Sequence, residues 1–225
     1  METFVYDTAD EVAEAVGATV SSDINKTDGQ FSLGLAGGST PEATYKKLLR
    51  TATDWTKVTA WLADERWVAD DSDRSNGHMA AQALFDHVPA RLVRPDWSED
   101  LSPDESATRY GKFLQALHAE SRPDIVLLGL GADGHTASLF PRSSALDETR
   151  HRYVANTIPE SGEVRLTATY PLLNSTRRII FVVVGPSKAE ALKASLAGAS
   201  PAGKVDGRYT EVEWHVDRQA ASLLS

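Results

Sequence analysis

The chain of 225 residues contains no cysteine. Disulfides, cysteine-ligated zinc and thiol nucleophiles are therefore excluded. The chain also lacks any run of more than two adjacent lysines or arginines, and its 23 basic against 32 acidic residues give a net charge of −9. This composition argues against nucleic acid and anionic membranes as partners, although a few local cations suffice to bind an anionic substrate.

No apolar run approaches the length needed to cross a membrane. The N-terminal stretch METFVYDTADE has no basic segment followed by an apolar core, so we expect a soluble, cytoplasmic protein. No Pro/Gly/Ser-rich linker, internal repeat or low-complexity tract divides the chain, and we expect one domain over residues 1–225. The sequence does not fix the oligomeric state; we favour a monomer.

Strands are expected at 31–36, 58–62, 125–128 and 179–184, and the last two are unbroken apolar runs, typical of strands buried on both faces of a parallel sheet. A further strand is expected at 4–6. Helix starts follow from capping boxes, in which a Ser or Thr precedes Glu by three residues. The boxes are Thr8/Glu11, Ser39/Glu42, Ser102/Glu105 and Ser187/Glu190, and a further helix is expected to open at Ser75 and Asn76. Strands alternating with capped helices predict an α/β fold, a mostly parallel sheet covered by helices on both faces.

Beyond Pro141 the pattern is weaker. Residues 153–157 and 165–170 read as extended segments, and 171–174 as a turn. We expect an edge strand at 214–216 and a final helix at 217–224.

The exit of the strand at 125–128 carries three glycines with Asp133 and His135. Its G-x-G-x-x-G spacing raises a dinucleotide-binding alternative, but that fingerprint needs a long helix from Gly134, and Pro141 comes too soon. We therefore expect no nicotinamide or flavin cofactor. His135 is either a structural loop histidine or a proton-transfer group, and the acidic and glycine-rich surroundings favour the second.

The other strand exits carry polar groups as well. Gly37, Gly38, Ser39 and Thr40 open a helix and suit a phosphate, although a well-capped helix that binds nothing explains them equally. Asp64, Glu65 and Arg66 follow the strand at 58–62, and Lys188 lies where a cation opposes the dipole of its own helix. Because exits of parallel strands share one sheet edge, these groups predict a site for a small phosphorylated substrate.

The motifs GLAGGSTP, ADERWV with SNGHM, GLGADGHTASLFP and VVGPSKAEAL, in this order, resemble the 6-phosphogluconolactonase family of the sugar-phosphate isomerase/deaminase superfamily. The resemblance spans nearly the whole chain and implies a three-layer Rossmann-like fold. Related glucosamine-6-phosphate deaminases carry F-N-E-P where this chain has Ser138 to Pro141, and D-E-Y where it has Asp64 to Arg66. Both departures favour the lactonase.

The family's reaction is hydrolysis of a sugar lactone to 6-phosphogluconate in the oxidative pentose phosphate pathway. The resemblance implies that His135 activates water, that Asp133 orients the imidazole, and that Arg66 stabilises the oxyanion or holds the phosphate. Substrate and phosphate contacts are then expected from Gly37, Gly38, Ser39, Thr40, Asp64, Glu65, Arg165 and Lys188. No metal or cofactor is required.

Two alternatives remain open at this point. One is an isomerase/deaminase acting on an amino-sugar phosphate, in which Asp64 abstracts a C2 proton. The other is a non-catalytic sugar-phosphate sensor on the same scaffold, which binds 6-phosphogluconate without hydrolysing the lactone.

Overall fold

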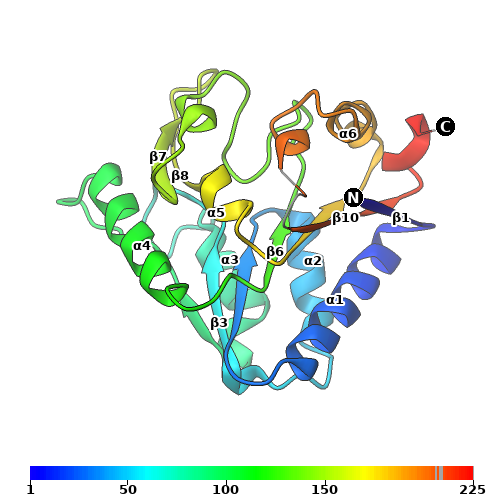
Figure 1. Cartoon of the computed structure of the whole chain (residues 1–225), viewed down its shortest axis with the longest axis horizontal. Helices are drawn as coiled ribbons and strands as arrows, with labels where there is room; N and C mark the ends of the chain where they lie inside the picture. The colour runs from blue at the N-terminus through cyan, green and yellow to red at the C-terminus, as the bar shows by residue number, and fades with distance from the viewer. Residues whose placement is uncertain (206, 208–209, 225) are drawn as a thin grey trace.

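The computed structural model describes residues 1–205, 207 and 210–224. Its centre is a seven-stranded sheet in which every pair of neighbours is parallel (Figure 1). The strands, in spatial order, are β1 (Glu2–Tyr6), β10 (Glu211–Asp217), β9 (Arg178–Val183), β6 (Ile125–Leu128), β2 (Phe31–Leu35), β3 (Val58–Leu62) and β5 (Arg91–Val93). The strands expected at 58–62 and 125–128 have the expected bounds, since their side chains are buried throughout.

A second, three-stranded antiparallel sheet stands beside the first and consists of β4 (Asp64–Arg66), β8 (Val164–Ala168) and β7 (Tyr153–Thr157). Ala63 joins the two sheets: its N–H donates to Leu35 of β2, and its carbonyl accepts from Ala168 of β8, both at 2.7 Å. The small sheet therefore begins where β3 leaves the large one, at the edge to which the predicted site belongs.

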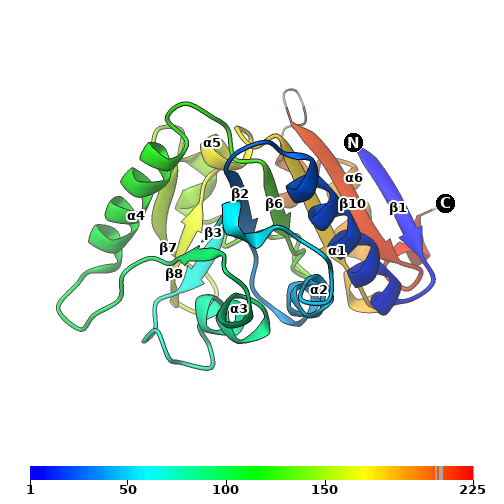
Figure 2. The same ribbon diagram turned by 90° about the horizontal axis from the view of Figure 1, so that it is seen from below.

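Helices cover both faces of the large sheet (Figure 2). One layer contains α1 (Ala9–Lys26), α2 (Ser39–Leu48) and α3 (Asn76–Ala83); the other contains α4 (Pro103–Leu117), α5 (Tyr170–Leu173) and α6 (Ala189–Leu196). Short 3-10 turns lie at Trp55–Lys57, Phe85–His87, Ser144–Asp147, Pro186–Lys188, Ala202–Lys204 and Ala220–Leu223. The predicted three-layer α/β fold is confirmed.

Each layer has its own hydrophobic core, and β6 contributes to both. Ile125 and Leu127 pack with the α1–α2–α3 layer, whereas Val126 and Leu128 pack with the α4–α6 layer. This alternation follows from the pleat of a strand, which sends successive side chains to opposite faces. A strand with two buried faces needs apolar residues at every position, which is why β6 reads as an unbroken apolar run.

Two of the four predicted capping boxes are present. The side chain of Thr8 accepts from the backbone N–H of Glu11, and that of Ser102 from the backbone N–H of Glu105. In both boxes the glutamate carboxylate accepts in turn from the backbone N–H of the cap residue. Ser75 also caps α3, as expected, by accepting from the backbone of His78.

The other two boxes were wrong. Gly38, with φ of +100°, is the N-cap of α2, so Ser39 lies inside the helix and caps nothing. At the β9 exit a 3-10 turn over Pro186–Lys188 intervenes, and Lys188 itself is the N-cap of α6. In both segments a glycine in the left-handed region redirects the chain before a hydroxyl can reach the cap position.

Near the C-terminus three expectations need correction. The strand expected at an edge is β10, which lies between β1 and β9, so β1 is the edge strand. The expected final helix is only the 3-10 turn Ala220–Leu223, and the turn expected at 171–174 is the short helix α5. Among the described residues, no helix combines the length and apolarity needed to span a membrane.

One buried histidine gives the fold a testable pH dependence. His118 is 5% exposed, and its Nε2 lies 2.7 Å from the hydroxyl of Ser32, which also accepts from the indole of Trp61. Burial, and secondarily the charge of Arg152, lower the pKa of His118 to about 4. The folded state therefore binds fewer protons than the unfolded state between that value and about 6.5, the usual histidine pKa.

We predict that this histidine weakens the fold as the pH falls below about 6.5, by about 2 kcal/mol at about pH 5. Urea unfolding of wild type and His118→Gln, at neutral pH and at pH 5, measures the effect. The variant has no imidazole to protonate, so its free energy of unfolding should change less between the two pH values. Equal pH dependence in the two proteins contradicts this assignment.

Candidate active site

The four polar strand exits predicted from the sequence are consecutive along one edge of the sheet, because β9, β6, β2 and β3 are neighbours. A narrow pocket of about 90 Å³ opens among three of them. It is lined by Ala36, Gly37, Asp64, Arg66, Asn76, Gly129, His135, Ala137 and Arg165. Five residues predicted at separate places in the sequence thus meet in one pocket: Gly37, Asp64, Arg66, His135 and Arg165.

A wider pocket of about 660 Å³ adjoins the narrow one and shares Arg66, His135 and Arg165 with it. Its remaining lining consists of Asp133, Phe140, Pro141, Arg142, Ile158, Glu160, Ser161 and Glu163. These residues come from the loop after β6 and from the turn between β7 and β8. The shared residues therefore lie between a narrow inner part and a wide mouth.

Asp133 and His135 form a hydrogen-bonded pair. The Asp133 Oδ1 atom lies 2.6 Å from His135 Nδ1 and also accepts from the His135 backbone N–H at 3.1 Å. A carboxylate at Nδ1 holds that proton there, which leaves Nε2 as the basic atom. Burial alone raises the pKa of Asp133, but the backbone and imidazole of His135 together lower it below its usual value. The imidazole also packs on the ring of Phe140, with centroids 4.1 Å apart.

The glycines of this loop allow the close approach. A Cβ on Gly131 would lie 2.1 Å from His135 Nδ1 and 2.6 Å from Asp133 Oδ1. Gly134 has a φ of +82°, a conformation that side chains disfavour. Gly131 therefore makes room for the hydrogen-bonded pair, and Gly134 turns the chain toward it.

Arg66 and Arg165 face each other across the small sheet, since Arg66 of β4 is paired in register with Arg165 of β8. Side chains at opposed positions of antiparallel strands lie on the same face, and like charges there repel. Each guanidinium has one fixed contact: Arg66 Nη1 donates to the carbonyl of Arg74 at 2.6 Å, and Arg165 Nη2 to Glu163 at 2.9 Å. Within the part of the chain that the structure describes, the Nε atoms of both arginines are buried with no hydrogen-bond partner. This arrangement suits an anion between them.

Asp64 and Asn76 form an acceptor-rich wall of the narrow pocket. The Asn76 amide nitrogen donates to the backbone carbonyl of Asp64 at 2.9 Å and to its carboxylate at 3.3 Å, while Ser138 donates to that carboxylate at 2.7 Å. The buried Asn76 Oδ1 atom accepts no hydrogen bond from any of the described residues. The sequence predicted a helix start at Asn76 but no role in the site; its place in the motif SNGHM, soon after a charged strand exit, was the available signal.

Glu65 has a different place from the one predicted. Its carboxylate is 7% exposed and accepts from the hydroxyl of Ser75 and from the backbone N–H groups of Arg66, Asn76 and Gly77. Burial raises the pKa of Glu65 although these donors oppose the shift. Glu65 lines neither pocket of the site. It fixes the first turn of α3 against β4, and so positions the neighbouring Arg66 and Asn76.

The predicted phosphate loop is only partly in the pocket. Gly37 lines it, but Ser39 and Thr40 line a separate apolar pocket of about 130 Å³ with Val182 and Val184. Lys188 is half-buried at the β9 exit, on the same edge, and lines neither pocket of the site.

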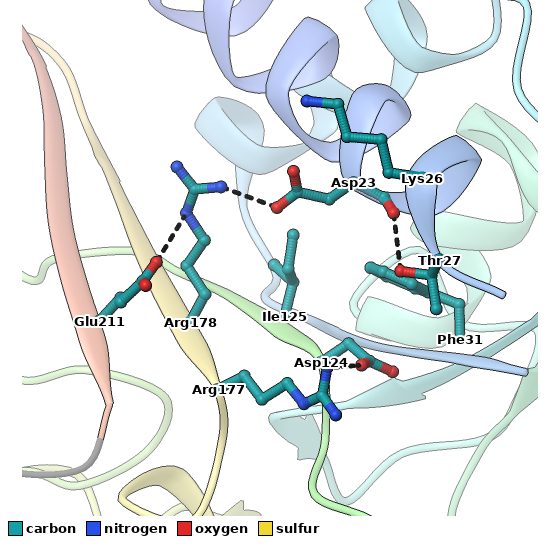
Figure 3. Close-up of a pocket in the computed structure, with 9 residues that line it drawn as sticks. All are labelled: Asp23, Lys26, Thr27, Phe31, Asp124, Ile125, Arg177, Arg178 and Glu211. Carbon is teal, nitrogen blue, oxygen red and sulfur yellow. Dashed lines mark hydrogen bonds and ion pairs between the residues drawn. The ribbon is translucent and has the colours of Figure 1, made fainter.

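Another charged pocket, of about 250 Å³, lies at the opposite edge of the sheet, where β2, β6, β9 and β10 begin (Figure 3). There Arg178 pairs with Asp23 of α1 at 2.7 Å and with Glu213 of β10 at 2.7 Å. Because carboxylates and guanidiniums compensate each other, this pocket reads as an ion-pair network that joins α1 to the sheet.

Among the described residues there is no group of three or more His, Asp or Glu side chains placed to hold a metal. The side chains described at the site supply an oriented imidazole, two guanidiniums and a row of acceptors.

The geometry predicts that Gly131→Ala breaks the Asp133–His135 hydrogen bond, because the new methyl group and the imidazole cannot occupy the same space. Gly129→Ala is the matched control, since a Cβ there meets no atom within 4 Å. NMR of ¹⁵N-labelled histidine should show loss of the hydrogen-bonded Nδ1 proton in the first variant and its retention in the second. A retained Nδ1 signal in Gly131→Ala contradicts the steric argument.

Comparison with known proteins is consistent with this geometry. The family described as glucosamine-6-phosphate isomerases/6-phosphogluconolactonase matches residues 7–214. A 6-phosphogluconolactonase from Nostoc is 36% identical over 212 residues, which cover 89% of this chain and 87% of the relative. The 6-phosphogluconolactonase structure from Trypanosoma brucei has a TM-score of 0.88 at 26% identity, with 100% and 98% of the chains covered. A monomeric glucosamine-6-phosphate deaminase has a TM-score of 0.83 at 27% identity, with 99% and 100% covered. This chain belongs to the glucosamine-6-phosphate isomerase/6-phosphogluconolactonase family.

Proposed function

We propose that this chain hydrolyses 6-phosphogluconolactone to 6-phosphogluconate, as a cytoplasmic enzyme of the oxidative pentose phosphate pathway. The observation that carries the proposal is a single pocket shared by a carboxylate-oriented imidazole and two opposed guanidiniums. The first supplies proton transfer, and the second supplies positive charge for an anionic substrate. Relatives that are 33–37% identical over most of the chain bear the name of this activity.

The family includes both lactonases and amino-sugar deaminases, and the loop after His135 favours the lactonase. The deaminase-like pattern F-N-E-P puts an acid where this chain has Phe140. In the structure the centroid of the Phe140 ring lies 4.1 Å from that of the imidazole, and among the described residues Asp133 supplies the one carboxylate bonded to His135. A lactonase requires one proton-transfer group that can activate a water, and in this site His135 is that group.

In the proposed mechanism, His135 Nε2 takes a proton from water while the water oxygen bonds to the lactone carbonyl carbon. The carbonyl oxygen becomes an oxyanion. When this tetrahedral intermediate collapses, the bond from carbon to ring oxygen breaks, and His135 returns the proton to that oxygen. Asp133 holds the imidazole in the required tautomer and stabilises its charged form, and such general acid–base help accelerates reactions by about 10²–10⁴-fold.

The opposed arginines supply charge at both places where the substrate needs it, the phosphate and the developing oxyanion. Planar guanidiniums bind oxygen anions through paired hydrogen bonds. Asp64 and Asn76, as acceptors, face the sugar hydroxyls. We further propose that Gly38 and the amides of Ser39 and Thr40 at the start of α2, together with Lys188, add to the field that attracts the phosphate.

Purified protein assayed with freshly made 6-phosphogluconolactone, against the spontaneous background, tests the function directly. Release of ammonia from glucosamine 6-phosphate would instead identify a deaminase. Binding of 6-phosphogluconate without faster lactone hydrolysis would identify a sensor.

For the mechanism, we predict that His135→Ala lowers kcat by about a hundredfold or more, because general acid–base catalysis is lost. Binding of 6-phosphogluconate should change little, since the arginines remain. Steady-state kinetics and calorimetry on the same preparation separate the two quantities. If the variant retains near wild-type kcat, His135 has a structural role and the proposed mechanism is wrong.

For the phosphate, we predict that wild type prefers 6-phosphogluconolactone to gluconolactone and that Arg165→Met reduces the ratio of their kcat/KM values by about tenfold or more, through loss of charge-assisted hydrogen bonds. The ratio cancels general damage to the fold. Lys188→Ala is the companion variant, and its effect on the same ratio should be smaller because Lys188 lines neither pocket. If Arg165→Met impairs both lactones equally, the arginine pair does not bind phosphate.

A further inference from the structure

Arg142 has a backbone conformation that L-residues rarely adopt. Its φ is +64°, and it follows Pro141 at the rim of the wide pocket. Glycine adopts this left-handed region without penalty, whereas any side chain there is strained. Strained non-glycine residues cluster at functional sites, where the side chain or the conformation is used. An arginine in this place therefore raises the question of what its side chain does.

The ion pair of Arg142 contributes too little stability to explain why an arginine occupies this position. Arg142 Nη2 lies 2.5 Å from Glu160 Oε1, but the side chains are 78% and 51% exposed. Exposed ion pairs contribute little to stability, because water and salt screen them and both side chains lose freedom. The same weakness makes the pair easy to exchange for another anion.

The location of the pair is more informative. Arg142 follows the loop that carries His135, whereas Glu160 lies in the turn between β7 and β8, so the pair joins two different walls of the wide pocket. Arg66 and Arg165 line the same pocket. The nearby carboxylates are already engaged: Asp133 with His135, and Glu163 with Arg165 and Arg74. Arg142 is thus a third guanidinium on this pocket, the one nearest solvent by its exposure.

The negative net charge of the chain makes a cation at the mouth of the pocket useful for binding an anionic substrate. With a net charge of −9, the protein as a whole repels a phosphorylated substrate. Local cations at the mouth of a cleft reverse this effect by attracting the anion at short range. A guanidinium can also donate two parallel hydrogen bonds to a phosphate. One exposed carboxylate partner does not prevent this.

We propose that Arg142 captures the phosphate of the incoming substrate at the mouth of the site by exchanging Glu160 for it. This inference rests on the function proposed above. Glu160 is a competitor that holds the guanidinium across the mouth between substrates. Arg142 then acts on substrate entry and affinity, not on the chemical step.

The test is Arg142→Gly, because glycine removes the side chain and relieves the backbone. We expect kcat/KM for 6-phosphogluconolactone to fall about fivefold through KM, with kcat and the turnover of gluconolactone unchanged. The dependence of kcat/KM on salt should weaken as well. Meanwhile Tm should rise by about 2 to 4 °C, since the strain is gone. A purely structural arginine predicts neither substrate selectivity nor a changed salt slope.

Two further variants sharpen the result. Glu160→Gln removes the competing carboxylate, so it should raise kcat/KM for the phosphorylated lactone at low salt. Arg50→Gln, in the exposed segment after α2, changes the net charge by the same single unit as Arg142→Gly and should leave both lactones unaffected. Equal losses for the two lactones in Arg142→Gly, or equal salt slopes in Arg142→Gly and wild type, overturn the proposal.

The proposed function can fail separately. If wild type does not hydrolyse the lactone at all, the activity is wrong, and capture is then measured by calorimetry with 6-phosphogluconate and gluconate. Weaker binding of 6-phosphogluconate alone in Arg142→Gly supports the capture role. Unchanged binding of both overturns it.

Discussion

Parallel pairing of all seven strands is the constraint on which the site depends. In a parallel sheet every strand ends at the same edge, so the loops after β2, β3 and β6 converge although long stretches of sequence separate them. Each crossover needs a covering helix, and the two helical layers bury the two faces in separate cores. Reversing any one of these strands would move its functional loop to the opposite edge.

Much of this arrangement can be predicted from the sequence, where the determinants are local. β3 and β6 are apolar at nearly every position because both faces are buried, and the capping boxes at Thr8 and Ser102 depend only on residues three apart. The meeting of Gly37, Asp64, Arg66 and His135 followed from the strand exits alone. Family resemblance added Arg165 to the same set.

Most of what the sequence did not predict depends on long-range placement. Arg165 lies opposite Arg66 only because β4 and β8 pair in one register, and no local pattern encodes that pairing. The hydrophobic pattern of β10 likewise does not indicate its place in the sheet, which is between β1 and β9. The box at Ser39 failed for a local reason, since Gly38 turns the backbone with a φ of +100° and becomes the cap itself.

The two walls of the site belong to different sheets, joined through Ala63. The imidazole loop extends from the large sheet, whereas the arginines and the β7–β8 turn belong to the small one. Asn156 of β7 and Thr167 of β8 hydrogen-bond to Ser138 of the loop after β6, so the paired part of the hairpin and that loop are held together. The tip, residues 158–163, lies beyond this ladder and meets the loop segment through the exposed Arg142–Glu160 pair. Loop grafting confined to the tip would therefore alter the size of the substrate admitted before it alters the chemistry performed on it.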